Sequence, residues 1–309
     1  MMKFTVVLSA VAIISCNGFV HSFGIQHRGL KLRGGGVSMA ADTPELRPPK
    51  SMYENAVAAG ATKASSPPLK TFILGILSGC HIAFGGFMLL AVGGACPGLA
   101  TTNPGLQKLV AGAFGLPFGL MMTLVTGGEL FTGNTAVVTA AVIEKKAAFK
   151  DLLKNWFCSY GGNFVGSLLM AYLVFNGKTL GVGAAAINLS NLKLSSNFGT
   201  LFIRGVLCNW LVCMAVYMAS GCTSLISKMV AIWFPISAFV ALGLEHSIAN
   251  MFLIPLGIML GAPISYKEFL LKNLLPVTLG NIVGGAVCVA GAFSATYGSL
   301  LEKKTAEVK

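Results

Sequence analysis

The sequence predicts an all-α membrane protein in which six transmembrane helices form two related halves of three. The first observation is composition: 55% of the 309 residues are hydrophobic, 10% are charged, and the mean hydropathy is +0.77. Soluble domains carry about 25% charged residues, so this composition argues against a cytosolic enzyme, a nucleic-acid-binding module and a secreted disulfide scaffold. The second observation is a series of six apolar segments, and the third is a polar interruption in two of them.

The net charge of +12 arises from Lys and Arg residues in the tails and short connections, without a dense basic block. We therefore expect no nucleic-acid partner. The eight cysteines include no Cys-x-x-Cys pair and fall mostly inside apolar segments, which favours buried thiols over metal ligands or redox centres. The sequence predicts neither a metal site nor another cofactor.

Residues 1–41 are predicted to be a targeting leader. A basic start is followed by the apolar run Phe4–Cys16, which has the length of a signal-peptide core and is too short to span a bilayer. The residues after it are basic, contain serine, and include no acid before Asp42, as is typical of transit peptides. This combination resembles the two-part leaders of algae with secondary plastids and favours a plastid envelope membrane. The alternative is a plain secretory signal with a polar linker, and the plasma membrane is the alternative location.

A polar lead-in (42–66), a transport domain (67–298) and a polar tail (299–309) follow. The apolar segments of the transport domain lie at about 69–95, 106–143, 152–176, 198–220, 224–260 and 269–298. The second and fifth are too long for one straight span, and they are interrupted at 126–134 and at 244–250. Non-helical backbone at membrane depth is tolerated only where it faces protein or a water-filled cavity. Broken helices at matching places therefore indicate a permeation site.

The two halves, about 67–178 and 196–298, share a sequence pattern. Asn155, Gly162, Asn163 and Gly166 recur as Asn273, Gly280, Asn281 and Gly284, displaced by 118 residues. Glu129 and Asn134 recur as Glu245 and Asn250, displaced by 116 residues. Two nearly equal displacements indicate an internal repeat. Each half has three spans, an odd number, so we expect the halves to be inverted relative to one another.

Four ionisable residues other than cysteine lie inside the predicted spans, away from the helix ends: His81, Glu129, Glu245 and His246. Such groups are costly in a membrane and indicate function by default. We expect Glu129 and Glu245, with Asn134 and Asn250 in the same breaks, to be structural, because a carboxylate there can accept hydrogen bonds from freed backbone N–H groups. His81 is expected to be a packed, satisfied core histidine.

His246 differs from the other three because the repeat places Leu130 at the equivalent position. A single imidazole beside the break can supply a proton or a hydrogen bond to an anion in a pore. The alternative is a neutral histidine that is locked by a hydrogen bond to the opposite break.

Four motifs are similar to the signatures of the formate/nitrite transporter family. They are Gly-Gly-Glu-Leu-Phe-Thr-Gly-Asn (127–134), Arg-Gly-Val-Leu-Cys-Asn-Trp-Leu-Val-Cys-Met-Ala (204–215), Glu-His-Ser-Ile-Ala-Asn-Met (245–251) and Asn-Leu-Leu-Pro-Val-Thr-Leu-Gly-Asn-Ile-Val-Gly-Gly (273–285). The resemblance covers about residues 67–298. It implies an aquaporin-like fold with six spans in the lipid bilayer, a homopentamer with one pore per protomer, and small monovalent anions such as nitrite, formate and lactate as substrates.

The resemblance also implies roles for individual residues. His246 resembles the central pore histidine of the family, Thr132 its hydrogen-bond partner, and Asn209 an asparagine that faces the pore. Lys193 aligns with a lysine in a vestibule, where it would attract the anion. The apolar residues that narrow the pore would be Leu120, Leu130, Phe131, Val212 and Phe239.

The mechanism that we expect follows from the cost of desolvating an anion. A bare anion crosses an apolar constriction at a cost of many kcal/mol, whereas a neutral acid crosses far more easily. We therefore expect two apolar gates around a polar chamber, in which His246 and Thr132 donate hydrogen bonds or a proton. A plastid location would make nitrite the cargo, and formate or lactate is the alternative.

Two other classes of function fit the sequence less well. A neutral-solute channel of the aquaporin type would carry two Asn-Pro-Ala elements at the breaks, and the sequence contains none. An enzyme that used Glu245 and His246 as an acid–base pair would also need a nucleophile or a metal cluster, and no such ligand spacing is present. The sequence therefore predicts a transport protein rather than an enzyme.

Overall fold

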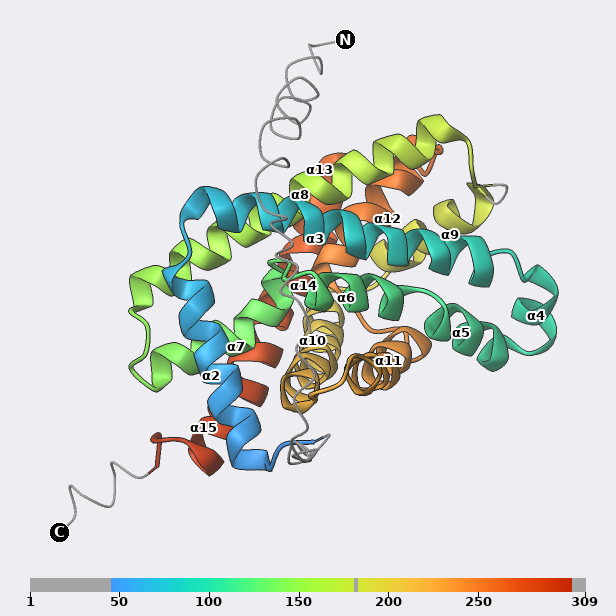
Figure 1. The fold of residues 1–309 in the computed structure, drawn as a ribbon. Helices are drawn as coiled ribbons and strands as arrows, with labels where there is room; N and C mark the ends of the chain where they lie inside the picture. The colour runs from blue at the N-terminus through green and yellow to red at the C-terminus, as the bar shows by residue number, and fades with distance from the viewer. Residues whose placement is uncertain (1–45, 181–182, 302–309) are drawn as a thin grey trace, which may run out of the picture. The chain divides into compact units, whose positions relative to one another are not determined.

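The computed structural model describes residues 46–180 and 183–301, all within one compact unit that spans residues 43–309. The predicted leader (1–41) and most of the predicted polar tail lie outside the described residues. The described part is built from helices, and its single β-type contact is an isolated antiparallel bridge between Leu46 and Cys222 (Figure 1). This agrees with the predicted all-α class.

The helices follow one another with short connections. In chain order they are α2 (Pro49–Ser65), α3 (Pro68–Met88), η1 (Leu89–Gly93), α4 (Pro97–Thr102), α5 (Pro104–Ala113), α6 (Leu116–Val125), α7 (Phe131–Ile143), α8 (Phe149–Gly177), α9 (Gly183–Leu194), α10 (Phe198–Gly221), α11 (Leu225–Ala241), α12 (Ser247–Met259), α13 (Tyr266–Glu268), η2 (Phe269–Leu274), α14 (Leu275–Gly285), η3 (Ala286–Gly291) and α15 (Ala292–Tyr297), where η marks a π-helix.

Within residues 46–180 and 183–301, five helical stretches are long and apolar enough to cross a membrane: Pro68–Gly93, Pro104–Val125, Phe149–Gly177, Phe198–Gly221 and Tyr266–Tyr297. Three shorter apolar helices are Phe131–Ile143, Leu225–Ala241 and Ser247–Met259. The predicted fifth segment is therefore not one span-length helix, because it is divided into α11 and α12. The predicted second segment is divided in the same way, into α5 and α6 followed by α7.

The first interruption covers residues 126–130 and is shorter than the predicted 126–134. The second covers residues 242–246, so it is shorter than the predicted 244–250 and begins earlier. The helices end at Val125 and at Ala241, and the next ones begin at Phe131 and at Ser247. Each break turns at a glycine with a left-handed backbone conformation, Gly127 with φ +77° and Gly243 with φ +68°, which only glycine adopts without strain. The polar residues of 131–134 lie inside α7, because their side chains are buried and hydrogen-bonded there.

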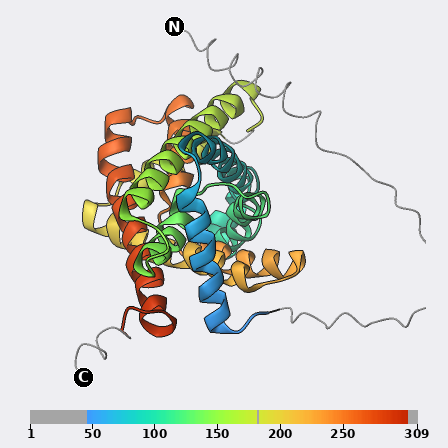
Figure 2. The same cartoon turned by 60° about the vertical axis from the view of Figure 1, so that its left-hand side comes forward.

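Helix α2 was not expected from the sequence, which reads as a polar lead-in there. Its residues Met52, Tyr53, Ala56 and Val57 are buried, and α2 lies beside α7 (Figure 2). A Cβ atom on Gly60 would stand only 1.8 Å from the carbonyl oxygen of Val137. Helix α2 thus packs against α7 through close backbone contact at Gly60. The sequence did not reveal this contact, because the average hydrophobicity of α2 is low.

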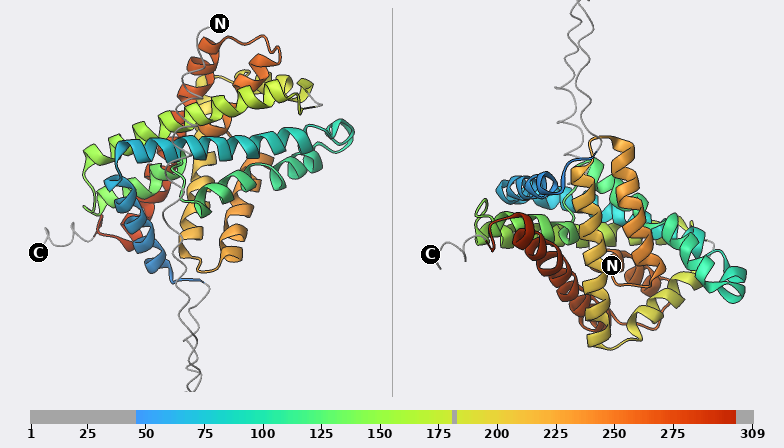
Figure 3. Two further views of the ribbon diagram at one scale, coloured as in Figure 1. Left: turned by 45° about the horizontal axis from the view of Figure 1, so that its top comes forward. Right: turned by 90° about the horizontal axis from the view of Figure 1, so that it is seen from below.

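Two helix pairs pack in the same way. Helix α3 runs along α8, and α10 runs along α14 (Figure 3). A Cβ atom on Gly75 would stand 3.2 Å from Cα of Gly162, and one on Gly205 would stand 3.2 Å from Cα of Gly280. Small residues allow such close backbone approach, which is a main source of helix association in lipid. The four glycines therefore bring α8 close to α3 and α14 close to α10.

Candidate functional site

An asparagine of α8 satisfies the backbone at the first break. Oδ1 of Asn163 accepts a hydrogen bond from the backbone N–H of Phe131, the first residue of α7, at 2.9 Å. Nδ2 of the same amide donates to the carbonyl oxygens of Glu129 at 2.9 Å and of Gly75 at 2.8 Å. A helix start in an apolar environment needs such partners, because its first N–H groups have none within the helix.

The second break has the same arrangement, built from α14. Oδ1 of Asn281 accepts from the backbone N–H of Ser247 at 2.9 Å. Its Nδ2 donates to the carbonyl oxygens of Glu245 at 3.0 Å and of Gly205 at 2.8 Å. The first backbone N–H of each helix is therefore bound by an asparagine amide, whereas the sequence analysis had expected the carboxylates in this role.

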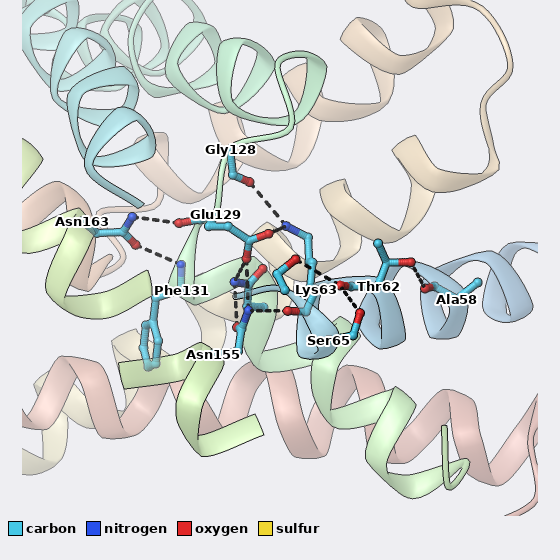
Figure 4. A network of polar contacts seen from close by, with 11 residues as sticks. Ala58, Thr62, Lys63, Ser65, Gly128, Glu129, Phe131, Asn155 and Asn163 are labelled. Atoms are coloured by element: carbon cyan, nitrogen blue, oxygen red, sulfur yellow. Dashed lines mark hydrogen bonds and ion pairs between the residues drawn. The ribbon is translucent and has the colours of Figure 1, made fainter. Parts of the chain in front are cut away.

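The carboxylate of Glu129 instead binds side chains from three other elements (Figure 4). Nζ of Lys63, at the end of α2, lies 2.8 Å from Oε1. The Nδ2 atoms of Asn134 and Asn155 donate to Oε2 at 2.7 Å and 3.2 Å. The charge of this buried carboxylate is thus paired with a lysine and fixed by two amides, which is the condition for burying an ion without a large cost.

Glu245 has matching partners in the second break. Nζ of Lys193 lies 3.0 Å from Oε2, and Nδ2 of Asn250 donates to the same oxygen at 2.6 Å. Asn250 also donates to Oδ1 of Asn273 at 2.8 Å, and Asn273 donates to the carbonyl oxygen of Lys193 at 2.8 Å. Lys193 was expected to align with a vestibule lysine that attracts the anion. Its ammonium is bound to Glu245, and its side chain is 10% exposed. The lysine and the carboxylate balance each other's charge.

Lys63 is a site residue that the sequence analysis missed. The signal for it was present: Lys63-Ala-Ser-Ser recurs as Lys193-Leu-Ser-Ser, displaced by 130 residues, and Gly75 recurs as Gly205 with the same displacement. It was overlooked because the resemblance was placed from residue 67 onward, beyond Lys63.

A hydrogen bond between the two breaks joins Thr132 of α7 to His246, which precedes α12. Nε2 of His246 lies 2.9 Å from Oγ1 of Thr132, and Nδ1 accepts the backbone N–H of Ala249 at 3.1 Å. Because Nδ1 accepts, the proton of a neutral ring is on Nε2 and is donated to Thr132. The imidazole is 3% exposed. The predicted pair is therefore formed, and the ring is locked to the opposite break.

His246 borders a narrow cavity whose other walls are apolar. The lining residues are Ile82, Leu116, Leu120, Leu130, Val212, Ile236, Phe239 and His246. The ring of Phe239 lies 5.8 Å from the imidazole and is inclined to it by 30°. Four predicted constriction residues are thus brought together, but the space beside them is an apolar cavity with one polar group, not the polar chamber that we expected. Ile82, Leu116 and Ile236 were missed because nothing distinguishes them from other apolar residues of their helices.

Four residues that were predicted to lie along the path or to narrow it do not line this cavity, namely Phe131, Thr132, Asn209 and Lys193. Phe131 packs edge-on against Tyr160. Nδ2 of Asn209 donates to the carbonyl oxygens of Thr132 at 3.1 Å and of Asn281 at 2.6 Å, and so ties α7 to α14. His81 is partly exposed, with Nδ1 3.5 Å from the hydroxyl of Thr123, so it is less enclosed than expected. Among the residues that the structure describes, no group of three or more His, Cys, Asp or Glu side chains is placed to hold a metal ion.

Comparison with known proteins identifies the family. Residues 50–295 match the family model described as "Formate/nitrite transporter". The match begins 17 residues before the predicted start at 67 and so includes α2. A "Probable formate transporter" of Methanothermobacter thermautotrophicus is 42% identical over 76% of this chain and 91% of its own length. The "Formate channel FocA" of Escherichia coli K12 is 35% identical over 84% of this chain and 98% of its own length.

Solved structures agree. One titled "FNT family ion channel" has a TM-score of 0.70 and 29% identity, covering 80% of this chain and 98% of that one. Another, titled "Pentameric formate channel with formate bound", has a TM-score of 0.68 and 33% identity, covering 74% and 97%. The resemblance predicted from the four motifs is confirmed: the chain belongs to the formate/nitrite transporter family and is a multi-pass membrane transport protein.

Proposed function

We propose that this protein carries small monovalent anions, nitrite or formate, across its membrane through the cavity beside His246, and that the anion crosses as its neutral acid. The observation that carries this proposal is the cavity wall, in which His246 is the one polar side chain among seven apolar ones. A desolvated anion would be strongly disfavoured there, because its charge would lose hydration without gaining a counter-charge. The neutral acid loses only hydrogen bonds. The Nε2–H of His246, which is donated to Thr132, can replace one of them by taking the substrate as its acceptor instead.

The proton is proposed to join the anion before it enters the cavity. A neutral imidazole can donate a hydrogen bond from Nε2–H, but giving that proton away would leave an anionic ring. Protonating Nδ1 would break the hydrogen bond that Nδ1 accepts from Ala249 at 3.1 Å. The geometry therefore favours His246 as a hydrogen-bond donor over His246 as a proton carrier, and the proton comes from water at the mouth.

The two lysine–glutamate pairs are proposed to favour anions near the ends of the path. Glu129 is followed directly by Leu130, and Glu245 directly by His246, and both of these neighbours line the cavity. The Lys63 side chain is 23% exposed and the Lys193 side chain is 10% exposed. An ammonium that reaches water beside an apolar entrance raises the local anion concentration, while its paired carboxylate keeps the buried charge balanced.

The chain is proposed to cross the membrane six times, with α6–α7 and α11–α12 as the broken spans of two inverted halves. The matching asparagine and lysine contacts of the two breaks support this arrangement. Because α2 supplies Lys63, we extend the proposed transport domain from 67–298 to include α2. A homopentamer is proposed because a solved relative is titled as pentameric. The plastid envelope, with nitrite as cargo, is proposed from the leader composition alone, whereas the names of the relatives favour formate.

Uptake by liposomes tests the proposed function. Vesicles with the purified protein should take up formate and nitrite faster than empty vesicles, and each anion should enter together with a proton, so that the outer solution becomes more alkaline. The rate should rise as the pH falls toward the pKa of the substrate acid. Uptake of urea or glycerol with no uptake of either anion would instead establish a neutral-solute channel. A fluorescent fusion would locate the protein and so decide between nitrite in plastids and formate elsewhere.

A further inference from the structure

Tyr160 of α8 and Thr278 of α14 form a contact that joins the two halves. The two positions are displaced by 118 residues, the same displacement as between Asn163 and Asn281. Their hydroxyl oxygens lie 3.0 Å apart, so one donates to the other. Two residues that occupy equivalent repeat positions and touch each other lie on the local two-fold axis that relates the halves. The hydrogen bond therefore fixes α8 relative to α14 at that axis.

The ring of Tyr160 also holds the first residue of α7. Its centroid lies 4.8 Å from that of Phe131, with the planes inclined by 75°, an edge-to-face contact that favours aromatic pairs. Trp156 makes a second such contact with Phe131 at 5.9 Å and 78°. Asn163, one turn further along α8, accepts the backbone N–H of Phe131. One face of α8 thus clamps both the ring and the backbone of Phe131.

The clamped residue lies between two residues that reach the proposed path. Leu130 precedes Phe131 and lines the cavity, and Thr132 follows it and accepts the hydrogen bond from His246. In the second break the equivalent of Phe131 is Ser247, whose hydroxyl is buried and has no hydrogen-bond partner among the described residues. The aromatic clamp is therefore built on the first break, which is the one that carries the partner of His246.

We propose that Tyr160 is a positioning residue for the transport path, acting through Phe131 to place the Thr132 hydroxyl against His246 and Leu130 in the cavity wall. The Tyr160–Thr278 hydrogen bond holds the ring in the orientation that clamps Phe131. This inference rests on the proposed function of the cavity. Neither Tyr160 nor Thr278 borders the cavity, so neither touches the substrate.

The variants Tyr160→Phe and Thr278→Val test this proposal, because each removes one hydroxyl and keeps the packing volume. We expect each to slow anion uptake about fivefold, the size of effect expected for one lost hydrogen bond, and we expect the double variant to be no slower than either single one. Thr278→Ser keeps the hydroxyl and should transport at the wild-type rate. Tyr172→Phe, on the exposed part of the same helix, is the matched control and should also be unchanged.

A readout at His246 distinguishes positioning from general loosening. In protein labelled with ¹⁵N-histidine, the ring resonances of His246, assigned by their loss in His246→Asn, should shift in Tyr160→Phe and Thr278→Val but not in Tyr172→Phe. Slower uptake without that shift, or the shift with unchanged uptake, would overturn the proposal, as would wild-type behaviour in both measurements. The resonances report on the coupling whether or not the wild type moves an anion. Wild-type liposomes without uptake would therefore count against the proposed function and leave the structural coupling measurable.

Discussion

Nε2 of His246 lies 2.9 Å from the hydroxyl of Thr132, so that one hydrogen bond joins the interrupted segments of the two halves of the chain. This hydrogen bond occurs once and is not repeated between the equivalent positions of the two halves. Leu130 is at the position equivalent to His246, and Ile248 is at the position equivalent to Thr132, and neither side chain can form a hydrogen bond. The two halves share their scaffold of asparagines, lysines and glutamates and differ at this polar contact. The difference places one hydrogen-bond donor against an otherwise apolar cavity.

Replacing Thr132 tests the hydrogen bond itself. Thr132→Val keeps the shape of the side chain but removes the acceptor of the imidazole N–H, which leaves a buried donor without its partner at a cost of about 1–3 kcal/mol. We expect lower thermal stability in detergent and slower uptake of formate and nitrite by liposomes. Thr132→Ser, which retains the hydroxyl, is the control and should keep most of the transport. Equal uptake by the valine and serine variants would show that the contact has no part in transport.

The role of His246 as a hydrogen-bond donor is tested by comparing His246→Asn with His246→Phe. An asparagine can cap α12 through its side-chain oxygen and can donate from its amide, whereas phenylalanine can do neither. We expect the asparagine variant to retain uptake with the wild-type dependence on pH, because the proton travels on the substrate. The phenylalanine variant should lose at least about tenfold in rate, or about 1.4 kcal/mol. Wild-type uptake by His246→Phe would show that His246 has no part in the mechanism. Uptake by His246→Asn that no longer depends on pH would show that His246 carries the proton.

The ion pair in the second break makes a prediction about stability. Lys193→Met leaves the carboxylate of Glu245, whose side chain is 4% exposed, without its counter-charge. Removing one partner of such a buried pair typically costs about 3–5 kcal/mol. We expect a lower unfolding temperature in detergent, which the double variant Lys193→Met with Glu245→Gln should largely restore. Lys63→Met should cost less, because the Lys63 side chain is 23% exposed and water can replace part of its interaction.

Transport by the same variants separates stability from anion attraction. The double variant at Lys193 and Glu245 should be folded but should show a higher half-saturating anion concentration than the wild type. An unchanged half-saturating concentration would restrict Lys193 to a structural role.

Glu144, in the connection between α7 and α8, anchors α2 to the rest of the unit. It accepts hydrogen bonds from the hydroxyls of Tyr53 and Ser294 and from the backbone N–H of Ser299. Burial raises the pKa of Glu144, but the hydrogen bonds from Ser294, Tyr53 and Ser299 outweigh burial and hold the pKa below its usual value.

The anchor should therefore depend on pH. A carboxyl group whose pKa is lowered by folding contributes stability that is present above its ordinary pKa and is lost as the pH falls through the lowered value. We expect the backbone amides of α2 to lose protection against hydrogen exchange, measured relative to the intrinsic exchange rate at the same pH, below about pH 4.5. Glu144→Gln should show the same loss of protection at neutral pH. Glu54→Gln, at an exposed position of α2, is the control. Slow exchange in Glu144→Gln at neutral pH would mean that other contacts hold the helix.

The close approach of α3 and α8 can be tested with two adjacent glycines. A Cβ atom on Gly162 would stand 2.4 Å from the carbonyl oxygen of Phe72, whereas one on Gly161 would meet nothing nearer than a ring carbon of Phe72 at 3.6 Å. Gly162→Ala should therefore force the helices apart and lower the yield of folded protein, which size-exclusion chromatography would measure. Gly161→Ala should behave as the wild type, and equal behaviour of the two variants would contradict the packing described for this pair.

Patterns that are local in the chain determined much of this protein. The apolar segments, the two interruptions, the repeated asparagines and the four family motifs all lie within short stretches of sequence, and they predicted the helical class, the family and the pairing of His246 with Thr132. The tertiary structure decided which groups meet. Lys63 binds Glu129 across 66 residues, and Lys193 binds Glu245 across 52. The two carboxylates therefore bind lysine side chains, whereas backbone N–H groups had been predicted as their partners.

The same limit applies to the cavity. Five lining residues, His246 and four apolar ones, were predicted through the family resemblance. Ile82, Leu116 and Ile236 were not, because an apolar residue on an apolar helix has the same local pattern whether it faces lipid, another helix or an internal cavity. Packing distinguishes these environments, and packing is set by where glycines such as Gly75 and Gly162 let two backbones approach. The sequence by itself determined which apolar segments are helical and which two of them are interrupted. The contacts between distant helices decided the exact ends of those breaks and what the breaks face.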